Sequence, residues 1–282
     1  MPLPQVVVSD VPILYVEMDA TGVPVVKAET EDRAGHVEGQ PARTRQVKLG
    51  CVFTQTKTDE QGRPIRDPAS TTYSGAIEDA EPFGWRLFTE AWQRGWSRAR
   101  LQVVLGDGAV WIWNLADLHF PGAIQIVDLY HARQHLWELA AKLFPCDEKR
   151  RKRWVNRMLA RLDAGRIESL VAQLRASPAA RPELRGVFET EAQYFQRNAA
   201  RMRYPEFRAQ GLFVGSGVIE AACKTLIASP QAVGYVLDGP RCQCHRRPAL
   251  RAAQRTLRKL LGVPPTRRLT THIYVAHPCT TW

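Results

Sequence analysis

Three acidic residues, far apart in the chain, have the chemistry and the local setting of metal ligands. Asp19 follows an apolar six-residue run, and Asp107 follows another and lies between two glycines. Glu220 lies in the first turns of a helix expected to start at the Gly-Ser-Gly of 215–217. Sheet folds bind ligands at strand ends, where neighbouring glycines let a metal or phosphate approach. Two Asp and one Glu can supply oxygen ligands for two Mg²⁺ ions, a pair that serves phosphoryl transfer. Each acid taken alone could instead be a turn former or helix cap.

A second group of polar residues falls on one side of a predicted helix. Asp128, His131 and His135 are spaced i, i+3 and i+7. Two histidines at i, i+4 could bind zinc. The Glu that follows the first histidine in an HExxH zinc motif is missing here, however, and no third soft ligand is nearby. We favour Asp128 and His131 as residues that orient the site or contact phosphate. A plain structural role is the alternative.

The charge of the chain points to a polyanionic partner. The formal net charge is +11, which favours nucleic acid first and an anionic membrane surface second. Residues 229–282 hold nine Lys and Arg and one acid, and therefore most of the excess. A basic run follows Glu148 and is either a solvated helix face or a face that tracks phosphates. Its members are Lys149, Arg150, Arg151, Lys152 and Arg153, and Arg181, Arg197, Arg201 and Arg203 could extend it.

The elements that must position these residues follow from hydrophobic periodicity. The pattern predicts a mixed α/β fold, in which helices pack against a mixed sheet and an all-helical block interrupts it. An aromatic stripe over 80–97 is interpreted as core packing, with base stacking as the alternative. The predicted elements are strands at 13–18, 23–27, 47–56, 100–106 and 123–127, a turn at 19–22, a polar loop at 57–78, a helix at 80–97, and helices over 129–203 with breaks near Pro145, Gly165 and Pro178.

Composition excludes several classes of protein. Hydrophobic residues make up 45% and charged residues 24% of the chain, which argues against global disorder. No apolar run approaches the length of a membrane span, and the N-terminus lacks the basic segment of a secretory signal. Six scattered cysteines in a chain of this length favour a reduced, cytoplasmic setting.

Four segments, taken in their order, carry a family resemblance. They are YVEMDATGVPV (15–25), VVLGDGAVWIWNLA (103–116), IVDLYHARQHLW (126–137) and GLFVGSGVIEAACKTL (211–226). Together they resemble the bacterial insertion-sequence DDE transposases of the Kra-type family, which are allied to Mutator-like transposases. The resemblance implies an RNase H-like catalytic core over 10–128 and 211–228, with a helical insertion at 129–210 before the last acid.

The same resemblance implies roles for individual residues. Asp19, Asp107 and Glu220 would be the first, second and third catalytic acids and would hold Mg²⁺ or Mn²⁺. Asp128 and His131 match the family's Asp-x-x-His element. The implied reaction is DNA transposition, by phosphodiester hydrolysis at element ends followed by strand transfer to target DNA. A homodimer, in the bacterial cytoplasm at the nucleoid and not at a membrane, is implied as well.

The last 54 residues depart from the family pattern. Where the family continues with a block of the type SGMxWxxxGAxAIxxLR, this chain has SPQAVGYVLDGPRCQCHRRPALR. One valid choice of codons for residues 231–250, read one base later, encodes KQSGMFWTVRGANAIVALR. We therefore expect a frameshift near 228–231, which makes 229–282 an out-of-frame, poorly ordered tail. The alternative for the tail is a metal clip formed by Cys242, Cys244 and His245.

Three functional hypotheses remain open. The first is a transposase catalytic core, trimmed at both ends because only a dozen residues precede the first strand, with its activity lost. The second is a non-catalytic, basic DNA-binding remnant of a decayed element. The third is a cellular RNase H-like nuclease unrelated to transposition.

Overall fold

The computed structural model describes residues 11–24, 44–177, 181–215 and 217 of the 282-residue chain. The predicted strand at 23–27 is only partly covered, because residues 25–43 lie outside these ranges. The predicted helix after Gly217, with Glu220, and the whole tail at 229–282 also lie outside the described residues.

Five strands form one mixed sheet. Its order is β5-β2-β1-β6-β7, so the first strand is central and the later strands add to both sides. Strand β1 pairs in parallel with β6, and β6 pairs in parallel with β7. This mixed α/β arrangement, flanked by helices, is compatible with an RNase H-like fold. The strands are β1 (Val11–Pro24), β2 (Thr44–Gln55), β5 (Thr72–Ala76), β6 (Ala99–Gly106) and β7 (Ile124–Val127), and a separate antiparallel pair is formed by β3 (Lys57–Thr58) and β4 (Pro64–Ile65).

Nearly continuous apolar runs explain the central strands. Residues 13–18 of β1 and 103–106 of β6 are buried without alternation, as in strands covered on both faces, and Glu17 is the one charged residue among them. Tyr15 of β1 stacks on Phe53 of β2, with ring centroids 4.7 Å apart and planes 4° from parallel. Burial of both rings anchors neighbouring strands at the same level of the sheet.

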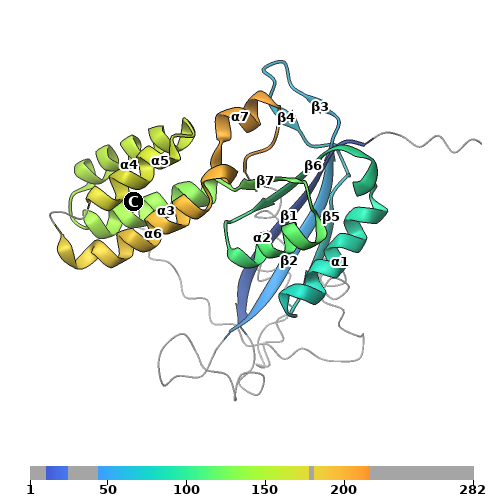
Figure 1. Ribbon diagram of the computed structural model, residues 1–282, viewed down its shortest axis with the longest axis horizontal. Coiled ribbons are helices and arrows are strands. Elements are labelled where there is room, and N and C mark those ends of the chain that lie inside the picture. The colour runs from blue at the N-terminus through green and yellow to red at the C-terminus, as the bar shows by residue number, and fades with distance from the viewer. Residues whose placement is uncertain (1–10, 25–43, 178–180, 216, 218–282) are drawn as a thin grey trace, which may run out of the picture. The chain divides into compact units, whose positions relative to one another are not determined.

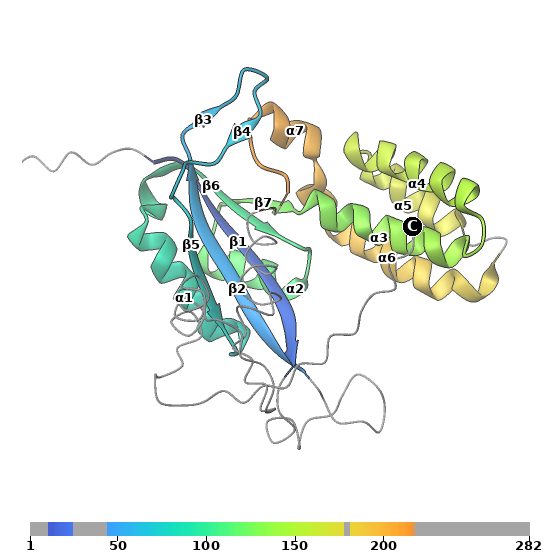
Figure 2. The ribbon, with the colours of Figure 1, turned by 180° about the vertical axis from the view of Figure 1, so that it is seen from behind.

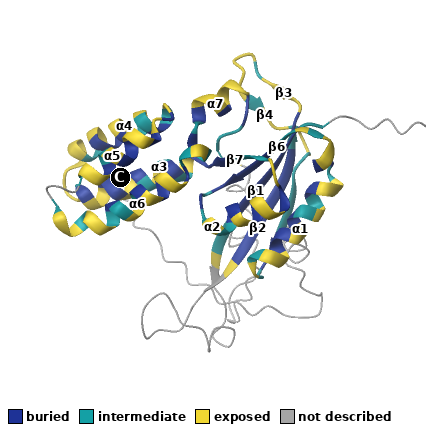
Figure 3. Ribbon diagram, in the orientation of Figure 1, coloured by how far each residue is buried: buried dark blue, intermediate teal, exposed yellow. Residues whose placement is uncertain are grey.

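The helices fall into two groups along the chain, α1 and α2 before β7 and α3 to α7 after it (Figures 1 and 2). In the first, Phe120 at the end of α2 packs edge-on against Trp96, with centroids 4.8 Å apart, and lies 6.1 Å from Phe88 of α1. The second contains a block of α3 to α6, whose inward sides are buried and outward sides exposed (Figure 3). The helices are α1 (Ala80–Gln93), α2 (Val110–His119), α3 (Leu129–Leu143), α4 (Glu148–Asp163), α5 (Ile167–Ala176), α6 (Arg185–Arg197) and α7 (Tyr204–Ala209), with short 3-10 helices at Trp96–Arg98, Pro182–Leu184 and Ala199–Met202.

Tertiary contacts divide the chain into two compact units. The first takes in the described residues of 1–18, 51–72 and 87–216, and therefore β6, β7 and all helices from α2 onward. The second takes in those of 19–50, 73–86 and 217–282. Within the second unit, Lys48 donates to the carbonyl oxygen of Glu78 at 2.9 Å, and Arg86 pairs with the Glu78 carboxylate at 2.9 Å.

Three local predictions were wrong. The turn expected at 19–22 is absent, because β1 runs on through Asp19 to Pro24 and forms no hairpin there. The polar stretch 57–78 is not one loop, since it contains β3, β4 and the sheet strand β5. Sheet pairing overrode the local turn composition in both places. In the aromatic stripe of α1, Phe83 and Leu87 are buried as expected, but Trp92 is 54% exposed.

The other predicted elements are confirmed. Helix α1 and strands β2, β6 and β7 form within a few residues of their expected bounds, and the described part of 129–203 is helical, with α3 ending at Leu143 and α4 at Asp163, next to the breaks expected near Pro145 and Gly165. The break expected near Pro178 lies outside the described residues. Whether this helical block is an insertion before the last catalytic acid stays a prediction. Among the described residues, no helix is both long and apolar enough to span a membrane.

Candidate functional site

The parallel register places three residues that each precede an aspartate at one level of the sheet, two of them at the ends of β6 and β7 and one inside β1. Met18 of β1 lies opposite Gly106 of β6, and Gly106 lies opposite Val127 of β7. The next residues in the chain are Asp19, Asp107 and Asp128. The sequence predicted acids at strand ends, and the register puts the preceding residues at one level of the sheet.

Asp107 opens a tight turn between β6 and α2. Its carboxylate oxygen Oδ1 accepts a hydrogen bond from the backbone nitrogen of Ala109 at 2.7 Å, which orients the side chain. Gly108 has a φ of +97°, a conformation that residues with a side chain rarely adopt. Gly108 therefore has a conformational role, whereas Gly106 leaves space, because a Cβ atom built on it would lie 2.8 Å from Cγ2 of Ile112.

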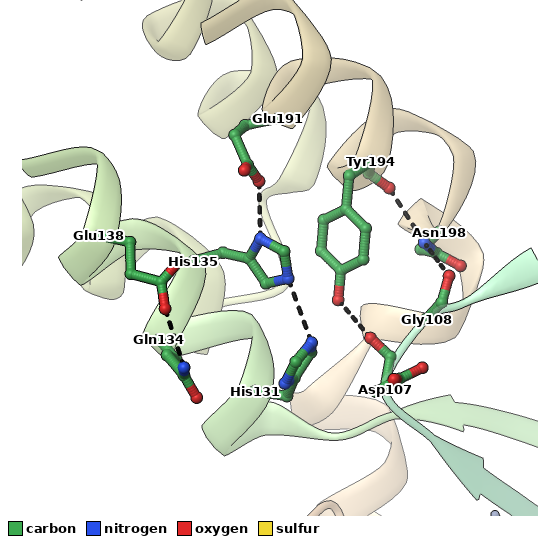
Figure 4. A network of polar contacts seen from close by, with 9 residues as sticks. All are labelled: Asp107, Gly108, His131, Gln134, His135, Glu138, Glu191, Tyr194 and Asn198. Atoms are coloured by element: carbon green, nitrogen blue, oxygen red, sulfur yellow. Dashed lines mark hydrogen bonds and ion pairs between the residues drawn. The ribbon is translucent and has the colours of Figure 1, made fainter. Parts of the chain in front are cut away.

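Helix α6 lies against this turn (Figure 4). The Tyr194 hydroxyl donates to the carbonyl oxygen of Asp107 at 2.7 Å, and the Asn198 amide nitrogen donates to the carbonyl oxygen of Gly108 at 3.4 Å. A Cβ atom built on Gly108 would lie 2.6 Å from Cε2 of Tyr194. The tyrosine ring occupies the space that a side chain at 108 would need.

Burial keeps the Tyr194 phenol protonated. It raises the pKa of the phenol well above its usual range, because the phenolate would lose its hydration. Three nearby carboxylates, those of Asp107, Asp128 and Glu191, raise this pKa further. Tyr194 is therefore a hydrogen-bond donor to Asp107 at any physiological pH.

Asp128 acts as the N-cap of α3. Its buried carboxylate accepts a hydrogen bond from the backbone nitrogen of His131 at 2.9 Å, and its own nitrogen donates to the carbonyl of Gly106 at 2.8 Å. These bonds give the residue the structural role that the sequence left open. The role of Asp128 and His131 toward DNA stays a prediction.

His131 and His135 are neighbours on one face of α3, as their spacing predicts. Their Nε2 atoms lie 3.2 Å apart, and Nδ1 of His135 lies 2.7 Å from a Glu191 carboxylate oxygen (Figure 4). The His135 ring stacks on Tyr194, with centroids 4.3 Å apart and planes 18° from parallel. Among the described residues, no group of three or more His, Cys, Asp and Glu is placed to hold a metal ion.

Asp19 is half-buried inside the extended strand β1. Its Oδ1 accepts a hydrogen bond from the backbone nitrogen of Ala20 at 2.6 Å. Asp19 belongs to the second compact unit and Asp107 to the first, and Glu220 lies outside the described residues. The joint role of the three acids as metal ligands stays a prediction.

The basic run of α4 is not uniform. Lys149, Arg150, Lys152 and Arg153 are exposed, and two of them pair with acids on the same helix end, Lys152 with Glu148 at 2.6 Å and Arg150 with Asp147 at 3.7 Å. Arg151 is half-buried and donates to the carbonyl oxygens of residues 144 and 145 at 2.9 and 2.7 Å. Arg151 therefore satisfies backbone carbonyls at the C-terminal end of α3.

Two of the four arginines suggested as extensions of this face are engaged inside the protein. Arg201 lies over the Trp113 ring, 4.6 Å from its centroid, and donates to Gln125 at 2.6 Å. Arg203 donates to the carbonyl oxygen of Gly165 at 2.7 Å. Arg197 and Arg181 are partly or fully exposed, and Arg181 pairs with Glu183.

The sequence did not predict the residues of α6 and its C-cap that contact His135 and the turn at Asp107. Glu191, Tyr194 and Asn198 follow each other at i, i+3 and i+7, so a helical face of polar residues was visible. Their partners lie 56 to 90 residues earlier in the chain, and no local spacing indicates them.

Comparisons with known proteins add little. No family model and no curated protein matches the chain. A search of solved structures found similarity to the Drosophila P element transposase strand transfer complex, with 11% identity, 65% coverage of this chain and a TM-score of 0.26. The matched region spans about half of that chain, 48% of its length, and a likeness this distant carries no argument about function.

The contact between Gly108 and Tyr194 generates a first prediction. Gly108→Ala should lower the free energy of unfolding by the cost of a positive φ, about 1 kcal/mol, and by a further 1 to 3 kcal/mol, roughly, for overpacking. Gly122→Ala is the matched control, because Gly122 also has a positive φ but no atom within 4 Å of its Cβ position. Urea unfolding of both variants measures the difference, and equal destabilisation would contradict the contact.

The N-cap at Asp128 generates a second prediction. Asp128→Ala should cost about 0.5 to 2 kcal/mol of stability because the first turn of α3 loses its acceptor. Asp128→Ser keeps a capping oxygen and should recover most of this loss. Thermal unfolding of the two variants tests the role, and a serine variant no better than alanine would exclude capping as the main contribution.

Proposed function

We propose that the chain is the catalytic core of a DDE-type DNA transposase, with an activity strongly reduced in its present form. The observation that carries the proposal is the register of the parallel strands, in which the residues before Asp19 and Asp107 lie opposite each other. A DDE site needs two aspartates at this level of neighbouring strands. The ordered motifs of the sequence support the same assignment.

The donor set fits a divalent cation with a preference for oxygen. Carboxylates are the ligands that Mg²⁺ and Mn²⁺ take most readily, and the hydrogen bond from Ala109 fixes the direction of the Asp107 carboxylate. Asp19, Asp107 and Glu220 would hold the ions. When bound, such a pair of ions activates a water or 3′-hydroxyl and stabilises the leaving oxygen of the phosphodiester.

The residues around Asp107 hold its backbone in place. Tyr194 and Asn198 donate hydrogen bonds to the carbonyl oxygens of Asp107 and Gly108. The turn is therefore held by these two side chains as well as by the hydrogen bond within it, from the Ala109 nitrogen to the Asp107 carboxylate. Positions of catalytic groups matter at this scale, because misplacement by about 1 Å can cost roughly a hundredfold in rate. We assign Tyr194 and Asn198 as positioning residues for the second acid.

The reduced activity follows from the replaced segment behind Glu220. If residues 231–249 stand where the in-frame block KQSGMFWTVRGANAIVALR belongs, the helix of the third acid lacks its packing partner. A chain that carries this block in place of residues 231–249 restores the family pattern. The comparison of this restored chain with the present one separates the catalytic proposal from the frameshift proposal.

The catalytic proposal predicts nicking that depends on metal and on Asp107. With supercoiled plasmid DNA and Mn²⁺, the restored chain should nick, and Asp107→Asn or Asp19→Asn should lower the rate at least about a hundredfold. Asp117→Asn is the control, since Asp117 is an exposed aspartate on α2. EDTA should abolish the reaction.

Four outcomes are informative. Metal-dependent nicking that survives Asp107→Asn, or no nicking by the restored chain, would refute the catalytic assignment. Equal rates for the restored and the present chain would refute the frameshift. Cleavage of RNA–DNA hybrids in preference to DNA would favour the RNase H-like nuclease instead.

A second candidate function is DNA binding without catalysis. Four exposed basic side chains on α4 and the net charge of residues 229–282 support it. Non-specific binding needs only charge, so it would persist in a chain that has lost its activity.

DNA binding through α4 predicts a change in salt dependence. The double variant Arg150→Ala and Arg153→Ala should weaken binding and reduce the slope of log K against log salt by about 2, one phosphate for each lost charge. Arg63→Ala is the control and should leave the slope unchanged, because Arg63 is an exposed arginine in the segment that joins β3 and β4. Fluorescence anisotropy at several salt concentrations measures it. Deletion of 229–282 should lower the affinity further, and an unchanged slope in the double variant would remove α4 from the interface.

A further inference from the structure

The two histidines of α3 present their Nε2 atoms to a common point. These atoms are 3.2 Å apart, the ring centroids are 4.8 Å apart, and the planes are 81° from parallel. Two imidazole nitrogens bound at about 2.1 Å to one ion lie about 3.0 Å apart for octahedral and about 3.4 Å apart for tetrahedral geometry. The separation in this protein falls between these two values.

The contact lies within the limits of a bent hydrogen bond between the rings, but a straight bond fits less well. A straight N–H···N bond of this length would place the ring centroids about 5.5 Å apart, because both nitrogens would point along the line that joins them. The observed centroid separation is shorter, so the two nitrogens do not point straight at each other. Convergence on a third position, beside the line between them, accounts for both distances.

Glu191 fixes the tautomer of the His135 ring. A carboxylate only accepts hydrogen bonds, so the 2.7 Å contact places the ring hydrogen on Nδ1 and leaves the lone pair of a neutral ring on Nε2. A carboxylate behind the second nitrogen is the common support of a metal-bound histidine. The stack on the Tyr194 ring restricts rotation of the His135 ring further, because the tyrosine lies against one face of the imidazole.

We propose that His131 and His135 chelate one divalent cation of the zinc type. Spacing of i, i+4 on a helix is a known chelating arrangement, and imidazole nitrogens select Zn²⁺, Co²⁺, Ni²⁺ or Cu²⁺ over Mg²⁺ and Mn²⁺. Two protein nitrogens leave the other positions to water or an anion, so the site is open. It is separate in ligand chemistry from the oxygen-ligand site proposed for the catalytic ions and does not depend on it.

The position of the ion links the histidines to the turn at Asp107. His135 lies on Tyr194, and Tyr194 donates to the carbonyl of Asp107. An ion on the two Nε2 atoms would hold the His135 ring against the tyrosine. Metal binding would therefore stiffen the support of that turn, with no requirement for the ion to take part in chemistry.

The test uses Co²⁺ binding to the full chain, followed by its visible absorption. Every protein carries Cys242→Ser, Cys244→Ser and His245→Asn, which removes the other metal-ligating cluster of the sequence. One equivalent of Co²⁺ should bind in the presence of excess Mg²⁺. His131→Gln or His135→Gln should lower the affinity at least about 10-fold, and Glu191→Gln about 10- to 100-fold.

Matched controls lie on the same helix. Glu138→Gln removes a carboxylate from α3, and Gln134→Ala removes its hydrogen-bond partner at 2.8 Å, yet both side chains are outside the histidine pair (Figure 4). Neither substitution should change the affinity. No saturable binding, or equal affinity after both histidine substitutions, overturns the proposal.

A second measurement removes the dependence on folding of the variants. X-ray absorption of the zinc-loaded protein with both histidines intact counts the imidazole ligands directly. Two imidazoles at about 2.0 to 2.1 Å are expected. One imidazole or none at the bound ion overturns the proposal.

Discussion

The parallel alignment of β1, β6 and β7 is the constraint on which the rest of the described structure depends. Met18, Gly106 and Val127 lie at one level, and the carbonyl of Gly106 then accepts from the nitrogen of Asp128. Because each backbone group of a strand end must find a partner, this bond fixes where β7 stops and α3 starts. A shift of β6 by one residue would reverse its side chains and break the bond. The alignment of the strands therefore sets the positions of the turn at Asp107 and of the face of α3 that carries the two histidines.

Helix α6 is the second support, and it acts on the backbone rather than on the acid itself. Tyr194 and Asn198 bind carbonyl oxygens of the turn, while the carboxylate of Asp107 is oriented by its own neighbour at Ala109. This division leaves the charge of the acid available for a ligand. Burial raises the pKa of the Tyr194 phenol well above its usual range, so the hydroxyl stays protonated and donates to the turn at any physiological pH.

Much of the architecture could be predicted from the sequence, for identifiable reasons. The strands of β6 and β7 are short apolar runs with clear ends, and the breaks of the helical block fall at Pro and Gly. The continuation of β1 past Asp19 could not be predicted, because a polar Asp-Ala-Thr-Gly segment is extended only when sheet neighbours pair with it. The sequence likewise could not distinguish Arg151 from its exposed neighbours, because its bonds to the carbonyl oxygens after α3 depend on how α3 and α4 pack. The support by α6 depends on contacts across many residues of chain.

The attachment of α6 to the turn has a consequence for how the helical block can vary in length. The bonds to the turn and to the histidines come from one face of α6, that of Glu191, Tyr194 and Asn198. Insertion of a single residue between the first two of these would rotate one against the other by about 100° and break the set. Whole turns added to α4 and α5 would leave that face in register. Natural or designed variants of this chain should therefore tolerate inserted turns in α4 and α5, whereas insertions or deletions in α6 should be destabilising.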